Sequence, residues 1–227
     1  MEALPRQESV FDAVYVAIRD SICEGDLAPG ERITQDELAE RLGVSRQPVA
    51  QALILLKSQG FVSETGRRGV VVATLDTEMV QSIYEIRGSL DGLAARLAAR
   101  RASADDVGRG EEILAHGRLL VETGNVRQLV KADIAFHEFV YELSGNALIR
   151  QALSAHWQHL RRVMAAVIEQ PDYRGFLWDE HAGILDAIRN GDEAEAGAQS
   201  ERHVAAASQA LQNKIAQSDM TGTRASA

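Results

Sequence analysis

The sequence lacks the residues that disulfide-bonded, membrane-spanning and sheet-rich proteins need. Cys23 is the single cysteine among 227 residues, which excludes an internal disulfide and an all-thiolate metal site. With only 4 prolines and 5% aromatic residues in a background of Ala, Leu, Arg and Glu, the composition favours helices over sheets. No apolar run approaches the ~20 residues that cross a bilayer, and residues 1–10 carry no signal-peptide pattern. We therefore expect a cytoplasmic, mainly helical globular protein with no membrane segment.

Basic residues are also in short supply, which at first argues against nucleic-acid binding. The 24 Lys and Arg residues stand against 33 Asp and Glu residues, a net charge of −9. Residues 41–69 reverse this balance, because Glu64 is the only acidic residue there. The basic residues of this stretch are Arg41, Arg46, Lys57, Arg67 and Arg68. Charges are screened beyond ~10 Å, so a local basic surface can contact DNA on an acidic protein.

Residues 1–75 have the pattern of three short helices followed by a hairpin. Residues 34–37, Thr-Gln-Asp-Glu, form a capping box that begins the second helix, and Gly43-Val44 ends it. Ser45 can cap the third helix. The helices are expected over residues 10–25, 34–42 and 45–60, and the hairpin strands over 61–64 and 70–73.

The second and third helices, joined by a tight turn, predict a helix-turn-helix motif. The first turn of the second helix in such a motif faces the base edges of the major groove. Arg46 can reach a guanine or a phosphate, Gln47 can pair with adenine, and the helix start at Ser45 offers backbone N–H groups to a phosphate. A structural helix pair is the alternative, but the basic hairpin tip that follows favours a DNA-binding wing. The predicted DNA-binding residues are Ser45, Arg46, Gln47, Gly66, Arg67 and Arg68.

From residue 76 the pattern changes to long amphipathic helices with short joints. Start signals occur at Asp76, Ser103, Asn125, Asn146 and Asp192, with a further break at Pro171. They predict an antiparallel all-α bundle of about six helices. The expected organisation is a winged helix-turn-helix domain over 1–75, a helical domain over 76–218 and a disordered tail over 219–227.

The helical domain contains a candidate metal site. Asp133 and His137 lie four residues apart on the same side of one helix as Phe136, so both point inward. His181 begins an apolar stripe, and His203 is aligned with small alanines on the last helix. A buried aspartate is costly unless it is paired or binds a metal. Asp133, His137, His181 and His203 are therefore predicted to bind a divalent transition metal. The alternative is that they are ordinary core residues that form hydrogen bonds.

Both halves resemble one known family. Residues 27–32, 37–49 and 60–62 closely resemble the winged helix of GntR-superfamily transcription regulators, although Ala50 stands where that family usually has a DNA-contacting arginine. Asp133-x-x-x-His137, Glu180-His181 and His203 resemble the FadR-type ligand-sensing (FCD) domain. The metal-binding members of that family use one Asp and three His at these places. The resemblance covers about residues 9–215.

The resemblance implies a homodimeric regulator, more often a repressor, that binds a palindromic operator and responds to a small carboxylate. Zinc is the favoured metal, with nickel or manganese as alternatives. Arg87 occupies a position where the family places a pocket arginine that grips the effector; a surface salt bridge with Glu85 or Asp91 is the alternative. Arg161 or its neighbour Arg162 is a second, less supported candidate.

Other interpretations of the residues lead to different functions. A metal-dependent hydrolytic or lyase-type enzyme is one, and a constitutive DNA binder with a purely structural metal is another. The sequence has no His-Glu-x-x-His signature and no phosphate loop, so we expect no enzyme. His116 is expected at the surface, and His156 and His159, beside Trp157, are expected to face solvent rather than line a pocket.

Overall fold

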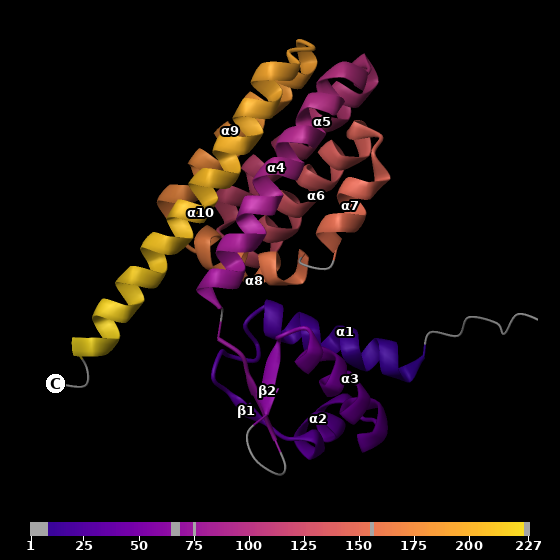
Figure 1. Cartoon of the computed structure of the whole chain (residues 1–227), viewed down its shortest axis with the longest axis vertical. Coiled ribbons are helices and arrows are strands. Elements are labelled where there is room, and N and C mark those ends of the chain that lie inside the picture. The colour runs from indigo at the N-terminus through magenta and orange to yellow at the C-terminus, as the bar shows by residue number, and fades with distance from the viewer. Residues whose placement is uncertain (1–8, 65–68, 75, 155–156, 225–227) are drawn as a thin grey trace, which may run out of the picture. The chain divides into compact units, whose positions relative to one another are not determined.

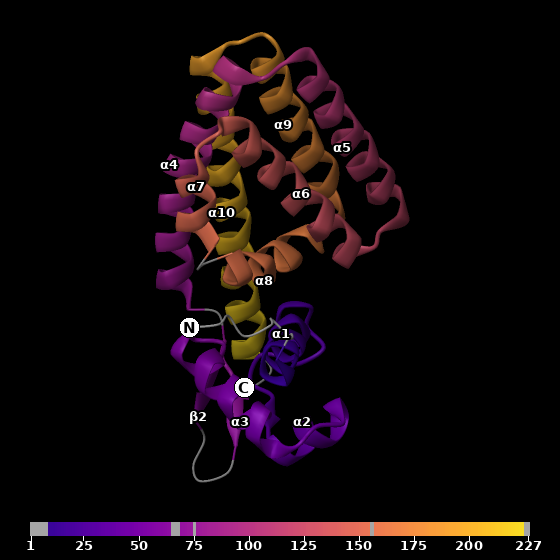
Figure 2. The same cartoon turned by 90° about the vertical axis from the view of Figure 1, so that its right-hand side faces the viewer.

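The computed structural model describes residues 9–64, 69–74, 76–154 and 157–224. The chain divides into two compact units, Met1–Asp76 and Thr77–Ala227. Figures 1 and 2 show the elements of both units. None of the described helices is both long and apolar enough to cross a membrane.

The N-terminal unit combines three helices with a small antiparallel sheet in the order β1-β3-β2. The outer strands β1 and β2 both pair with β3. Strand β1 was not predicted from the sequence. Residues 65–68 of the predicted wing lie outside the described residues. The elements are α1 (Val10–Cys23), β1 (Arg32–Ile33), α2 (Gln35–Leu42), α3 (Arg46–Ser58), β2 (Val62–Glu64) and β3 (Val70–Val72).

Local signals set the geometry of the α2–α3 pair. The capping box is present, because the Thr34 side chain accepts from the Glu37 N–H while the Glu37 side chain accepts from the Thr34 N–H. Gly43 ends α2 with φ +65°, a left-handed conformation that glycine adopts without steric cost. Ser45 occupies the N-cap position of α3, but its hydroxyl makes no capping hydrogen bond. The buried face of α3 then packs into the core through Val49, Ala52, Leu53 and Leu56.

Seven helices form the described C-terminal unit, one more than the expected set of about six. The additional helix arises because the segment after Asn146 contains two helices where one was expected. Helix α4 packs along α10 and α6, and α5 packs against α6 and α9; Figure 2 shows α4 beside α10. The helices are α4 (Thr77–Arg101), α5 (Ala104–Thr123), α6 (Val126–Ser144), α7 (Ala147–Ser154), α8 (Trp157–Ile168), α9 (Pro171–Arg189) and α10 (Glu193–Arg224).

The ends of this unit's helices follow the sequence signals closely, except at the break between α7 and α8 and at the C-terminus. Ser103 and Asp106 form a capping box at the start of α5, and the Asn125 side chain caps α6. Helix α10 continues through residues 219–224, which we expected to belong to a disordered tail. Extending an existing helix adds one hydrogen bond per residue without a new nucleation cost, so a weakly helical end can continue it.

Gly117 of α5 shows how tightly α5 and α9 pack. A Cβ atom at Gly117 would lie 2.1 Å from the ring of Trp178, a residue of α9 that is 1% exposed. The absence of a side chain at Gly117 therefore makes room for the indole. Trp178 in turn lies edge-on to His181, with ring centroids 5.0 Å apart.

Candidate metal centre and DNA-binding surface

Four buried side chains from three helices converge inside the C-terminal unit. Asp133 and His137 come from α6, His181 from α9 and His203 from α10. One potential ligand atom from each lies within 4.8 Å of those of the others. None of the four residues is more than 3% exposed. The structure thus brings together all four of the residues predicted to bind a metal.

The hydrogen bonding of this cluster is incomplete. Asp133 Oδ1 and both ring nitrogens of His181 are buried and have no hydrogen-bond partner. His181 Nε2 lies 3.3 Å from Asp133 Oδ1. A buried polar atom without a partner costs about 1–3 kcal/mol, so three of them at one point require an explanation. Imidazole nitrogens and a carboxylate oxygen suit a divalent transition metal, and the donor set therefore fits such an ion.

Neighbouring carboxylates orient the ligand imidazoles. The Nδ1 atom of His203 lies 2.9 Å from Glu180 Oε2. Because a carboxylate only accepts hydrogen bonds, Nδ1 carries the proton and the lone pair is on Nε2. Contacts of this kind fix the tautomer and ring direction of metal-binding histidines. Glu180 is thus a supporting residue whose role becomes visible only in the folded chain, although it belongs to the Glu180-His181 motif.

Burial controls the charge of the cluster. It raises the pKa of Asp133 to about 6, against the opposing effect of the Arg87 cation. Burial also lowers the pKa of His137 and His181 well below the ordinary value, and nearby Arg87 acts in the same direction. Both imidazoles therefore remain neutral near pH 7 and retain the lone pair that metal binding requires.

Arg87 joins the cluster from α4. Its Nε donates to Asp91 Oδ2 at 3.1 Å, and Nη2 lies 2.7 Å from His137 Nε2. Tyr141 Oη donates to the other oxygen of Asp91 at 2.5 Å. The ion pair between Arg87 and Asp91 that the sequence offered as an alternative is therefore present. It is buried and not at the surface, because each partner is 1% exposed. The four-residue spacing on α4 signals the pair, whereas its burial depends on packing.

A small cavity adjoins the cluster. It has a volume of about 20 Å³, roughly the space that one water occupies. Arg87, Asp133 and His203 line it, together with Tyr84 and Tyr173. Tyr173 Oη is buried and without a hydrogen-bond partner, a feature with no signal in the sequence. Cationic, phenolic and metal-ligating groups thus line one part of this space, and the rest is apolar, lined by Met164, Val167, Ile168, Leu177 and Ala207.

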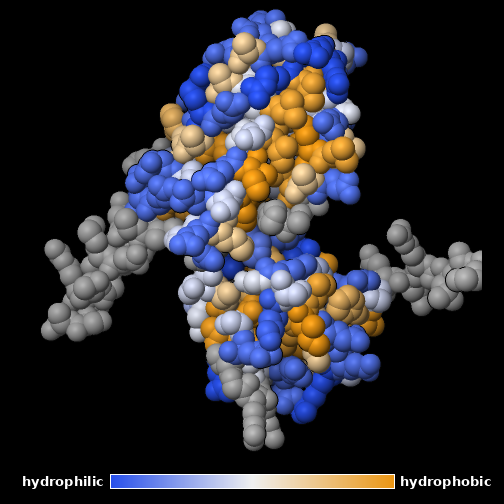
Figure 3. Space-filling model, in the orientation of Figure 1, coloured by the Kyte–Doolittle hydropathy of each residue, from blue (hydrophilic) through white to orange (hydrophobic). Residues whose placement is uncertain are grey.

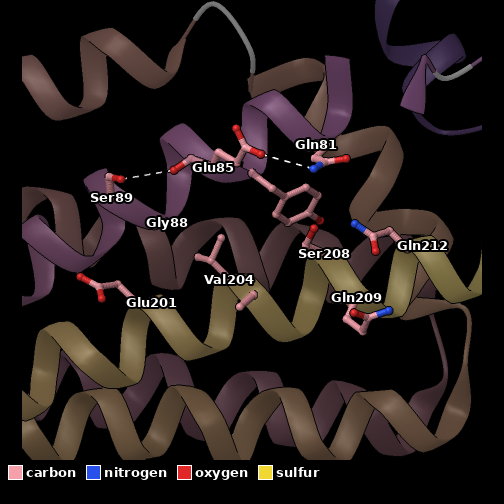
Figure 4. Close-up of a pocket in the computed structure, with 11 residues that line it drawn as sticks. Gln81, Glu85, Gly88, Ser89, Glu201, Val204, Ser208, Gln209 and Gln212 are labelled. Atoms are coloured by element: carbon pink, nitrogen blue, oxygen red, sulfur yellow. Dashed lines mark hydrogen bonds between the residues drawn. The ribbon is translucent and has the colours of Figure 1, made fainter. Parts of the chain in front are cut away.

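The larger hollow of the unit has a different character. It lies between α4 and α10, has a volume of about 480 Å³ and is shown in Figure 4. Its lining contains the carboxylates of Glu85 and Glu201, glutamine amides and hydroxyls, and no Lys or Arg. This lining offers no cation to an anion, whereas Arg87 supplies one at the cluster, although the cavity beside Arg87 has room for about one water and not for an organic acid.

The predicted DNA-reading residues are exposed at the start of α3. Ser45, Arg46 and Gln47 are all exposed, and the buried face of α3 leaves this turn free of the core. Arg46 forms an ion pair with Asp36 of α2, and both side chains are more than half exposed. Exposed ion pairs contribute about 0–1 kcal/mol, so a phosphate or a guanine can replace Asp36. Gly66, Arg67 and Arg68 lie outside the described residues.

The remaining predicted residues are less central. Arg161 of α8 is half-buried, donates to Gln158 Oε1 and is not among the residues that line the small cavity. His116 is exposed, as expected. The prediction that His159 faces solvent is wrong, because it is 4% exposed; the packed face of α8 includes it. His156 lies outside the described residues.

Two known families match the chain. Residues 11–72 match the bacterial regulatory proteins of the gntR family, and residues 82–206 match the FCD domain. The uncharacterized HTH-type transcriptional regulator YdhC of Bacillus subtilis (strain 168) is 27% identical over 177 residues, which cover 77% of this chain and 79% of that protein. The HTH-type transcriptional repressor RspR of Escherichia coli (strain K12) is 25% identical over 190 residues, 83% of each chain.

Solved structures share the fold. E. coli McbR/YncC superimposes with a TM-score of 0.72 at 23% identity and covers 92% of this chain and 97% of that one. A transcriptional regulator GntR from Rhodococcus sp. RHA1 superimposes with a TM-score of 0.75 at 22% identity, covering 89% and 97%. The arrangement of a winged unit followed by a helical unit is therefore common to all three chains.

Proposed function

The chain belongs to the gntR family of DNA-binding transcription regulators and carries an FCD domain, and we propose that a small organic acid bound at a metal site in this domain controls its binding to DNA. The family and the relatives are transcription regulators, which removes the metalloenzyme alternative. The observation that supports the metal site is the set of unpaired donor atoms on Asp133 and His181.

The residues of the cluster have separate roles in this proposal. Asp133, His137, His181 and His203 would hold a divalent transition metal, with zinc favoured over nickel or manganese. The bound ion would offer an open coordination position to a carboxylate. Arg87 supplies a cation beside that position, and the unpaired Tyr173 hydroxyl supplies a hydrogen-bond donor. Arg87 and the four candidate ligands are almost fully buried, and electrostatic interactions are stronger there than in water.

At the other end of the chain, α3 reads the operator. Arg46 and Gln47 contact base edges or phosphates from the first turn of α3, and the basic hairpin tip contacts the backbone. Ala50 offers no charged group, so the operator differs from those of relatives that have arginine there. We further propose a homodimer that binds a palindrome and represses transcription, because two-fold protein symmetry requires two-fold DNA symmetry. The name of the RspR repressor supports the direction of regulation.

The test measures metal, DNA and ligand on one preparation. Operator fragments are selected from genomic DNA by the purified protein, and binding is followed by fluorescence anisotropy with Zn²⁺-loaded and chelator-treated protein. A panel of small mono- and dicarboxylic acids is then added. We expect one metal per chain and an acid that releases DNA only from the loaded protein.

A constitutive DNA binder with a structural metal predicts different results. Chelation would then unfold the helical unit, and no acid would change DNA affinity with or without Zn²⁺. This outcome, or the absence of stoichiometric metal in the wild type, contradicts the proposed regulation.

A further inference from the structure

The outward side of α3 extends beyond the residues that the sequence predicted to contact DNA. It carries a row of residues spaced three or four positions apart, so they lie on one side of the helix. All of them are exposed except the alanine, which is half-buried, and the opposite side of α3 packs into the core. The row consists of Gln47, Ala50, Gln51 and Ile54, and it is called the α3 stripe below.

The α3 stripe carries no charge. Between Arg46 and Lys57 the sequence of α3 has no Lys, Arg, Asp or Glu, so the basic residues lie near the two ends of the helix. Lys57 forms an ion pair with Glu64 of β2 at 2.5 Å. Affinity for the phosphate backbone comes mainly from cations, so a neutral surface gains little from a row of phosphates. A row of amides and alkyl groups instead matches the base edges, which offer hydrogen-bonding groups and methyl groups.

The position of Ile54 makes its exposure informative. Ile54 is 69% exposed, and Figure 3 shows other apolar side chains among polar ones on the surface of the N-terminal unit. Single exposed apolar residues are common and need no explanation by themselves. Ile54, however, lies one helical turn beyond Ala50 in the row that begins at Gln47. The isoleucine therefore continues the surface that starts in the first turn of α3.

Each side chain of the α3 stripe matches a group of an A·T pair. A glutamine amide donates to N7 of adenine and accepts from its N6 amino group, which gives a bidentate contact in the major groove. Apolar side chains contact the methyl group of thymine. Guanine is bound by Arg or Lys and cytosine by Asp or Glu, and the α3 stripe contains none of these residues.

The length of the α3 stripe sets how many base pairs it can contact. Gln47 and Gln51 are about 6 Å apart along the helix axis, and Ile54 lies about 4.5 Å further. The whole stripe therefore spans about three base-pair steps of ~3.4 Å. We propose that Gln51 and Ile54 are specificity-determining residues and that the α3 stripe reads a run of A·T pairs in the operator. This inference rests on the proposed role of α3 in reading DNA.

The first test identifies the sequence that the full-length protein selects from a library of random DNA duplexes. We expect the selected sites to contain a run of A·T pairs about as long as the α3 stripe. The control is Gln59→Ala, which changes a glutamine at the C-cap of α3 whose side chain accepts from the Tyr15 hydroxyl at 2.9 Å. The control should select the same sequence as the wild type, because Gln59 is not part of the stripe.

A gain of specificity gives a readout that misfolding does not produce. Gln51→Arg should change the selected base at one position of the run from adenine to guanine, because arginine makes a bidentate contact with guanine O6 and N7. The other positions should stay the same. A destabilised variant would select the wild-type sequence more weakly or select nothing, and neither result changes one base to another.

The second test removes single groups from the bases of the selected duplex, and fluorescence anisotropy measures the dissociation constant. A deaza analogue of adenine that lacks N7 should weaken wild-type binding about tenfold at the base that Gln51 contacts, and should not weaken binding of Gln51→Ala further. Uracil lacks the thymine methyl group and should weaken wild-type binding about fourfold at one position, but not binding of Ile54→Ser. A glutamine that binds a phosphate would be insensitive to the loss of N7.

The outcomes separate this inference from the proposed function. The inference is wrong if the selected sites lack an A·T run, if Gln51→Arg selects the wild-type sequence, or if the base analogues affect the variants as much as the wild type. If Arg46→Ala still weakens operator binding in that case, α3 reads the DNA and only the role of the stripe fails. If neither Arg46→Ala nor Gln51→Ala changes the affinity or the selected sequence, the proposed role of α3 fails as well.

Discussion

Replacing His181 with leucine should stabilise the metal-free protein, which is the opposite of the usual effect of a core substitution. The two ring nitrogens of His181 are buried without hydrogen-bond partners, and each unsatisfied group costs about 1–3 kcal/mol. Leucine removes this cost but loses the ring contacts with Phe136, at 4.2 Å between centroids, and with Trp178. Aromatic pairs contribute about 0.5–1.5 kcal/mol each. The balance favours leucine by about 1–3 kcal/mol.

Zinc should reverse the order of stability. A ligand at 1,000 times its dissociation constant stabilises the folded protein by about 4.1 kcal/mol, more than the whole advantage of the leucine variant. The wild type gains this amount at the four-residue site, whereas His181→Leu has lost one ligand. The variant is then the more stable protein in chelator and the less stable one in Zn²⁺.

Thermal unfolding of the helical unit, followed by circular dichroism, measures both effects. For a domain of this size 1 kcal/mol shifts Tm by about 2–4 °C, so we expect the chelator-treated variant to unfold at least about 2 °C above the wild type. His116→Leu, which changes an exposed histidine of α5, is the matched control and should alter neither condition. A metal-free variant that unfolds below the wild type, or that retains the full Zn²⁺ shift, would refute the assignment of His181 as an unsatisfied ligand.

Three further changes test other parts of the structure. Arg46→Ala should weaken specific operator binding by about 1–3 kcal/mol in anisotropy titrations and leave Zn²⁺ content unchanged, because the exposed α3 turn and the metal site lie in different units. Gly117→Ala should destabilise the helical unit by about 1–3 kcal/mol in urea unfolding, since its Cβ would overlap the Trp178 ring. Burial raises the pKa of Asp133 to about 6, so the folded protein binds this proton more tightly than the unfolded chain does. The metal-free wild type should therefore lose stability as the pH rises from about 4 to above 6. Relative to Asp133→Asn, the loss should reach up to about 3 kcal/mol. A pH-independent difference would contradict the last prediction.

The metal site was predictable in part because one half of it is local. Asp133 and His137 are separated by one helical turn, and the apolar residues around them identify the buried face from the sequence. His181 and His203 also lie on buried faces of their helices. Periodicity reveals which side of a helix is buried, but it carries no information about which buried side chains meet. The resemblance to the FCD domain supplied that assignment.

The contacts of Arg87 illustrate what periodicity misses. Its pairing with Asp91 follows from spacing along α4. Its contact with His137 spans 50 residues and depends on the crossing of α4 and α6. The burial of His159 likewise depends on the packing of α8 against α6, α9 and α10, which local spacing does not reveal.

The sequence by itself determined most of the helix boundaries, the helix-turn-helix motif and the inward face of α6, because caps, left-handed glycines and apolar periodicity act among residues within about one turn of each other. Only the tertiary structure decided that three helices set four candidate ligands within 4.8 Å, that a guanidinium nitrogen lies 2.7 Å from one of their imidazoles, and that a tyrosine hydroxyl beside them is buried without a hydrogen-bond partner. Those features depend on the angles and separations at which distant helices pack, and such quantities arise from the whole core at once.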